Sequence, residues 1–125
     1  MTKTIVTIVI SALILALCSY GEYSEVNKTF DTFYDFLEQT DVKLKSENAS
    51  TNDAVALRDF WLEKKKSLHI WIPHADIKEV DLWLSETVAF TENGKFDEAR
   101  SKIVVLKGLA KQIPETYLIR IENIF

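Results

Sequence analysis

The chain has few of the residues that interrupt helices or build chemical sites. Its 125 residues include three Gly, two Pro, two His and a single Cys. One cysteine cannot form an intrachain disulfide, so packing alone must hold the fold together. The shortage of Gly and Pro favours long helices with short connections. We therefore predict an all-α protein with an N-terminal membrane helix followed by an antiparallel up-and-down bundle of about four helices.

Familiar enzyme motifs are missing as well. The sequence has no GxSxG nucleophile elbow, no phosphate-binding GxxxxGK loop and no zinc-binding HExxH segment. The formal net charge of -4 disfavours nucleic acid as a partner, because phosphate binding needs a basic surface. We expect a protein that is not an enzyme, with no catalytic residues, no metal, no cofactor and no nucleic-acid partner.

What the sequence does contain is an uncharged apolar run from Thr4 to Tyr20, preceded by Lys3. As a helix, Thr4 to Gly21 would extend roughly 27 Å, close to the ~30 Å hydrocarbon core of a bilayer. We expect residues 1–21 to be a transmembrane anchor or signal segment, with residues 4–20 in contact with membrane lipid. Cleavage after Gly21, which would release a secreted protein, is the alternative.

The flanks of the run predict its orientation. Lys3 precedes it, whereas mostly acidic residues follow it, and basic flanks stay on the cytoplasmic side. We expect a single-pass protein of the cell membrane, held by a signal anchor, with the domain of residues 22–125 outside the cell. The segment ending in Cys18 is similar to the box in which lipoproteins acquire lipid, but Leu17 stands where that box needs a small residue.

Four apolar stripes at helical spacing predict the helices of the bundle. The first covers residues 22–45 and carries Val26, Phe30, Phe33, Leu37 and Leu44, with Thr40 filling a gap and Tyr23 extending it backwards. The others are Ala54, Leu57, Trp61, Leu68 and Trp71; Ile77, Val80, Leu84, Val88 and Phe90; and Ala99, Ile103, Leu106, Ala110 and Ile113. Between the apolar run and the first stripe, Gly21 allows either one long helix or a bend.

Capping residues and breakers predict where these helices begin and end. Ser50, Thr51 or Asn52 is expected to cap the second helix, and Gly94 to end the third in a left-handed conformation. Pro73 should end the second helix, and Pro114 the fourth. The apolar tail of residues 115–125, which includes Tyr117, Ile121, Ile124 and Phe125, is expected to pack back on the bundle as a short helix or extended strap.

Several segments also carry a resemblance to a known family. They are the apolar run, Trp61 with Lys65, Ile72 and His74 before Asp76-Ile77, Leu84, Ala99, Leu106-Lys107, Ile113-Pro114-Glu115 and Asn123-Ile124-Phe125. The chain resembles the uncharacterised domain-of-unknown-function family 4363, short, N-terminally membrane-anchored helical proteins of Gram-positive bacteria. The resemblance implies a topology and a location, but no activity.

His74, Asp76 and Trp83 are the candidate interaction or turn residues. His74 beside Asp76 could serve as a general base or half a metal site, but a metal needs more ligands, and we expect the pair to build the turn, with Asp76 capping the third helix. Trp83 lies off its stripe and is the candidate exposed or membrane-facing contact, whereas Trp61 and Trp71 are expected in the core.

The expected function is that of a non-enzymatic interaction or accessory module for another membrane or envelope protein. The alternative is a peptide-binding or small-ligand-binding domain of helical hairpins, similar to tetratricopeptide repeats and either secreted or anchored. An unfilled apolar groove rimmed by Trp83 and Phe90 would favour this alternative.

Overall fold

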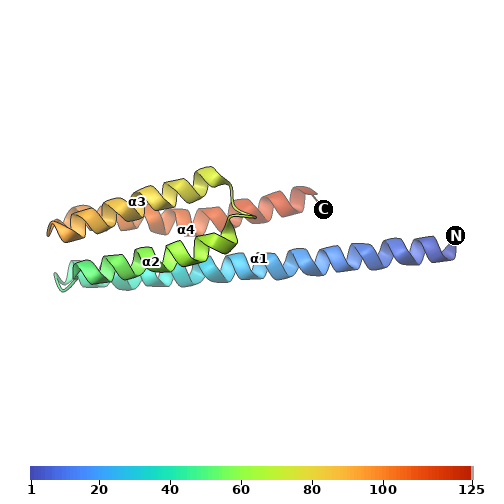
Figure 1. Cartoon of the computed structure of the whole chain (residues 1–125), viewed down its shortest axis with the longest axis horizontal. Coiled ribbons are helices and arrows are strands. Elements are labelled where there is room, and N and C mark those ends of the chain that lie inside the picture. Colours follow the sequence, from blue (N-terminus) through green and yellow to red (C-terminus); the bar gives the residue numbers. More distant parts are fainter. Residues whose placement is uncertain (125) are drawn as a thin grey trace.

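The computed structural model describes residues 1–124, apart from the side chains of residues 19, 22, 23 and 120–124. Over this range the chain forms four helices and no strand (Figure 1). The helices are α1 (Thr2–Lys45), α2 (Thr51–Leu68), α3 (His74–Glu92) and α4 (Phe96–Ile124). The predicted all-α class is confirmed.

The helices form a closed antiparallel bundle. Each helix packs against the one before it in the chain, and α4 returns to lie along α1 (Figure 1). The contact between α4 and α1 closes the ring, which an open pair of helical hairpins would leave unformed. The arrangement is the predicted up-and-down bundle rather than a tetratricopeptide-like pair of hairpins.

Helix α1 is continuous over 44 residues and passes through Gly21 without ending. Its C-terminal part packs in the bundle, whereas its N-terminal part projects beyond the ends of α2, α3 and α4 (Figure 1). Among residues whose side chains are described, none of the helices combines the length and apolar character needed to cross a membrane. The N-terminal membrane helix predicted from the sequence is thus not supported.

Aromatic side chains from α1 and α2 fill the centre of the bundle. Phe30, Phe33 and Trp61 are all at most 1% exposed. The ring centroids of Phe33 and Trp61 lie 5.2 Å apart, and those of Phe30 and Trp61 lie 6.0 Å apart. Such tilted pairs add to the stabilisation from burial. The predicted stripes are confirmed at every position whose side chain is described except Phe90, which is partly buried, and Trp71.

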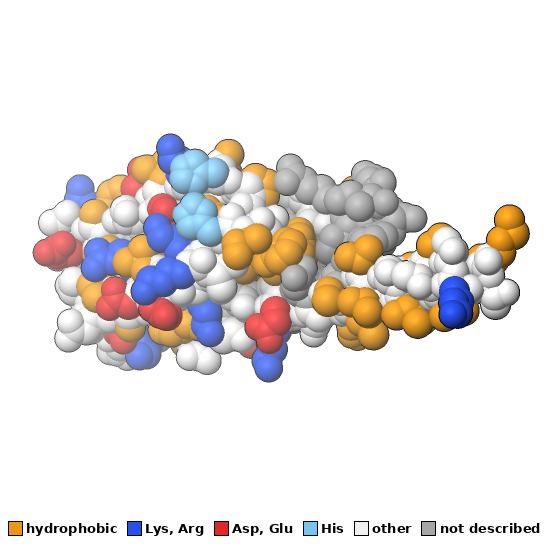
Figure 2. All heavy atoms as spheres, turned by 45° about the vertical axis from the view of Figure 1, so that its right-hand side comes forward, with side chains coloured by type: hydrophobic (Ala, Val, Ile, Leu, Met, Phe, Trp, Pro, Cys, Tyr) orange, Lys and Arg blue, Asp and Glu red, His pale blue; other side chains and the backbone are white. Residues whose placement is uncertain are grey.

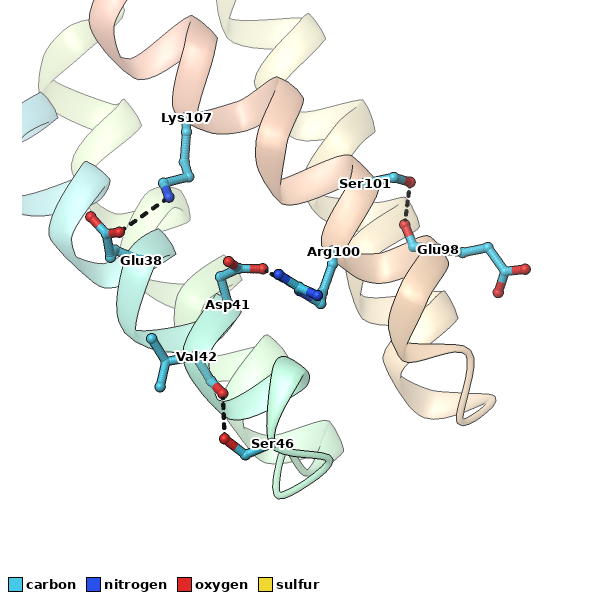
Figure 3. A network of polar contacts seen from close by, with 8 residues as sticks. All are labelled: Glu38, Asp41, Val42, Ser46, Glu98, Arg100, Ser101 and Lys107. Atoms are coloured by element: carbon cyan, nitrogen blue, oxygen red, sulfur yellow. Dashed lines mark hydrogen bonds and ion pairs between the residues drawn. The ribbon is translucent and has the colours of Figure 1, made fainter.

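Polar contacts connect helices that are adjacent in the bundle. The Trp61 ring nitrogen on α2 donates a hydrogen bond of 2.7 Å to Asp81 on α3, and the Lys65 ammonium lies 3.0 Å from the same carboxylate. Between α1 and α4, Arg100 pairs with Asp41 at 2.9 Å and Lys107 with Glu38 at 3.4 Å (Figure 3). The hydrogen bond that Arg100 donates to Asp41, together with the negative charge of Asp41, raises the pKa of Arg100 above its ordinary value.

The start of α2 follows the sequence prediction. Ser50 is the cap residue, and the Asp53 carboxylate accepts its backbone N–H at 2.8 Å and its hydroxyl at 3.2 Å. Lys43 at the end of α1 reaches the same carboxylate at 2.9 Å. The Ser50 backbone hydrogen bond and, after it, the Lys43 ammonium hold the pKa of Asp53 below its ordinary value. The loop between α1 and α2 is therefore fixed from both sides.

The predicted end of α3 is also confirmed. The helix ends at Glu92, and Gly94 adopts a left-handed conformation with φ +73°. The Lys95 N–H then donates to the Phe90 carbonyl at 2.8 Å, which satisfies a carbonyl at the helix end.

The prediction that Pro114 ends the fourth helix is wrong. Helix α4 continues through Pro114 to Ile124. Proline removes one helical hydrogen bond at a cost of about 3 kcal/mol. Ile113, at 4% exposed, and Tyr117, at 7%, nevertheless both join the core, so packing on either side of Pro114 offsets this cost. Of the predicted tail, Phe125 lies outside the described residues, as do the side chains of Ile121 and Ile124 and, in α1, that of Tyr23.

Candidate functional site

The projecting part of α1 is exposed and largely apolar. Every residue from Thr2 to Cys18 is exposed. Its large apolar side chains, each 49% exposed or more, are Ile5, Val6, Ile8, Val9, Ile10, Leu13, Ile14, Leu15 and Leu17. Because successive residues of a helix are about 100° apart, these positions cover roughly 260° of the circumference. The remaining sector carries Thr4, Thr7, Ser11 and Cys18. A helix of this kind normally lies in a protein core or in a membrane.

A second apolar feature is the loop between α2 and α3, residues 69–73, which we call the α2–α3 loop. Ile70 is 76% exposed and Trp71 is 39% exposed, whereas Leu68 and Ile72 on either side are 3% exposed. The N–H groups of Trp71 and Ile72 both donate to the Leu68 carbonyl at 2.9 Å. The loop is thus a compact turn between two buried anchors, and it holds Ile70 and Trp71 outward.

The α2–α3 loop and the projecting helix meet in a groove. Cys18, Gly21 and Val26 of α1 line it on one side, and Leu68 and Trp71 on the other. Its volume is about 600 Å³. The groove extends along α1 from Cys18 to Thr29, so Trp71 lies beside the segment of α1 in which the uncharged run ends.

The two histidines lie beside this loop. The rings of His69, in the loop, and His74, the first residue of α3, stack with centroids 5.8 Å apart and an interplanar angle of 16°. Figure 2 shows the histidines next to lysine side chains, with an apolar patch between them and the projecting helix. The closing of the loop brings the histidines together, although they are five positions apart in the sequence.

Asp76 does not form the predicted cap. Helix α3 begins at His74 with Pro73 in the cap position, and no side chain makes a cap hydrogen bond there. Asp76 is instead the third residue of the helix, and its backbone N–H donates to the Pro73 carbonyl at 3.0 Å. An acidic side chain in the first turn still favours the helix through its dipole.

The prediction that Trp83 is exposed and the prediction that Trp71 lies in the core both differ from the structure. Trp83 is partly buried between α3 and α4, with the Lys102 ammonium 4.9 Å from the centre of its ring. Within the described part of the chain its ring nitrogen is buried with no hydrogen-bond partner. Trp71, predicted in the core, is exposed because α2 ends at Leu68 and the helical spacing no longer applies beyond it.

A signal for the exposed loop was present in the sequence. Ile70, Trp71 and Ile72 are three consecutive apolar residues immediately before Pro73. At a helix end, three consecutive residues cannot all face one core, because each is rotated about 100° from the last. Some of them must therefore face outward.

The side chains at this end of the bundle form a surface suited to contact with another molecule. Among the described residues, no group of three or more His, Cys, Asp or Glu side chains is placed to hold a metal ion. The features that converge are an apolar helix, two exposed apolar side chains and a stacked pair of imidazoles. These features suit an apolar or interfacial environment.

Comparison with known proteins yields one match. A family model described as a domain of unknown function, DUF4363, matches residues 20–124. No curated protein and no solved structure matches the chain significantly. The matched range begins at Tyr20 and so covers the whole bundle, together with the end of the apolar run.

Proposed function

The chain belongs to the DUF4363 family, a domain of unknown function, and from its architecture we propose a non-enzymatic helical module that is anchored in the cell membrane by residues 4–20. Its bundle lies outside the cell and serves as an accessory or interaction partner of another membrane or envelope protein. The observation that carries this proposal is the apolar surface of α1 from Ile5 to Leu17, which no other described helix covers.

The free energy gained when apolar side chains leave water favours burial of this segment in lipid. Nine large apolar side chains of the segment are about half exposed or more. Each stabilises the protein by about 1.5–3 kcal/mol when it leaves water completely. The bundle has its own core, and this part of α1 projects beyond it (Figure 1). A bilayer provides that environment for the whole circumference of the helix.

The length of the segment is compatible with a bilayer. Residues 4–20 extend about 26 Å as a helix, slightly less than the ~30 Å hydrocarbon core. Local thinning of the bilayer accommodates such a short segment at a modest cost. Lys3 before the segment favours an external bundle, because basic flanks stay on the cytoplasmic side.

The interior of the bundle supports an interaction module over a ligand-binding groove. The Lys102 ammonium lies 4.9 Å from the ring centre of Trp83 and 5.8 Å from that of Phe90, so a side chain covers the place where a groove between these rings would open. On the outside, Leu82 of α3 and Val104 of α4 are 55% and 66% exposed. Such side chains provide apolar contacts for a partner protein.

Substitution of Leu13 tests the membrane anchor. This side chain is 58% exposed near the middle of the apolar segment. Arginine at the centre of a membrane helix costs about 2.5–3.5 kcal/mol, or about two orders of magnitude in partitioning. We expect the full-length protein and the control Leu13→Ile to float with liposomes in a density gradient, and Leu13→Arg to float much less. Equal flotation of both variants, or none for the wild type, would refute the anchor.

The partner is tested separately. Full-length protein, tagged at its C-terminus, is captured from detergent-solubilised membranes. Specific recovery of one integral membrane or envelope protein supports the accessory role, and the variant Val104→Asp should reduce that recovery if α4 contributes the contact. Recovery of the tagged protein alone from membranes that retain it would refute the accessory role and leave the anchor standing.

A further inference from the structure

The α2–α3 loop lies where a membrane surface would be, and we propose that it makes a second contact with the bilayer. Ile70 and Trp71 enter the interface between the lipid headgroups and acyl chains and fix the orientation of the bundle on the membrane. This inference rests on the proposed anchor in residues 4–20 and names a further site of the same interaction.

The level of Trp71 along α1 supports this contact. Trp71 lines a groove that extends along α1 from Cys18 to Thr29, and the uncharged run ends within this stretch, at Tyr20. With residues 4–20 in the hydrocarbon core, the end of the run lies at the boundary between lipid and water. Tryptophan and tyrosine favour this boundary, because their rings are apolar and carry one polar group. Tyr20 itself is 72% exposed.

The turn is built to hold these side chains outward. Leu68 and Ile72 are buried in the core. The backbone N–H groups of Trp71 and Ile72 both donate hydrogen bonds to the Leu68 carbonyl. Ile70 therefore stays exposed without any change in the fold. Ordering the loop costs little additional entropy upon insertion, because the turn is already formed.

The charges around the loop indicate which lipid property is recognised. His69, His74 and Lys66 lie near it, but Glu25 lines the same groove and Glu63 pairs with Lys66 at 3.0 Å. Positive and negative groups are thus mixed, which gives anionic headgroups little advantage. The contact depends on apolar insertion, and zwitterionic phosphatidylcholine should suffice.

Fluorescence quenching by lipid tests this contact. Full-length protein is reconstituted in phosphatidylcholine vesicles that contain lipid spin-labelled near the headgroup end of the acyl chain. We expect the lipid to quench part of the tryptophan emission. Most of this quenching should be lost in Trp71→Phe and retained in Trp83→Phe, the matched control for a partly buried ring.

Flotation and an aqueous quencher separate the outcomes. Vesicles that carry the protein but show the same lipid quenching in wild type and Trp71→Phe would overturn the loop contact and leave the anchor intact. In that case, quenching of Trp71 by acrylamide would place it in water, and protection from acrylamide would place it against a protein, such as a second copy of the chain. Failure of the wild type to float at all would instead refute the anchor.

Discussion

Replacement of Asp81 by alanine should destabilise the bundle by about 2–4 kcal/mol, as estimated from two contacts of one carboxylate. Trp61 is fully buried, and its ring N–H donates to Asp81 at 2.7 Å. Loss of a buried hydrogen bond to a charged acceptor costs about 1.5–3 kcal/mol. The Lys65–Asp81 pair is about a third exposed at each partner and contributes at most about 1 kcal/mol.

The assay is urea unfolding of the full-length protein in mild detergent, followed by circular dichroism and tryptophan fluorescence. Lys65→Met removes only the ion pair and should cost less than about 1 kcal/mol. Asp81→Asn keeps an acceptor for Trp61 and should fall between the two. Glu79→Ala, an exposed position of the same helix, should change stability by less than about 0.5 kcal/mol. The reasoning is wrong if Asp81→Ala costs no more than Lys65→Met.

Two further predictions concern the loops. Because the folded pKa of Asp53 is lowered, its contribution is fully present above the ordinary value of 3.8 and is lost as the pH falls through the folded pKa. Asp53→Asn should therefore lower stability by about 0.5–1 kcal/mol at neutral pH, and urea titrations that show the same deficit below the folded pKa would contradict this. Gly94→Ala should cost about 1–2 kcal/mol through its positive φ alone, since an added Cβ meets nothing within 4 Å. Gly94→Asn should cost less in thermal unfolding, and equal stability of all three proteins would exclude a strained left-handed position.

The local parts of the fold could be predicted from the sequence, because they depend on spacing along one helix. The stripe Val26, Phe30 and Phe33 indicates which face of α1 is buried, and Ser50 and Gly94 indicate helix ends from their own conformational preferences. Pro114 was misjudged because a local rule was applied where packing on both sides decides the outcome.

Contacts between helices could not be predicted in the same way. Asp81 lies off the apolar stripe of α3, and its partner Trp61 is twenty positions away. Asp41 and Arg100 are separated by fifty-nine positions. Periodicity identifies the buried face of a helix but not the residue opposite each side chain, so these pairs depend on the register of the assembled bundle.

The candidate site was located only in part. The apolar run and His74 were apparent in the sequence, whereas the stacking of His74 on His69 and the exposure of Trp71 depend on where α2 ends and how the loop turns. The sequence assigned the exposed contact to Trp83 because Trp83 lies off the apolar stripe of its helix. It placed Trp71 in the core because the helical spacing was continued past Leu68.

The most direct measurement of the central claim uses a spin label in the projecting helix. Cys18 is the sole cysteine, so Leu13→Cys in a Cys18→Ser background places one label within the apolar segment. In liposomes, collisions with oxygen should exceed those with a water-soluble nickel chelate at this position, and the order should reverse at Asp35→Cys, an exposed site on the bundle. Equal access of the nickel chelate to both positions would place the N-terminal segment in water and contradict the account.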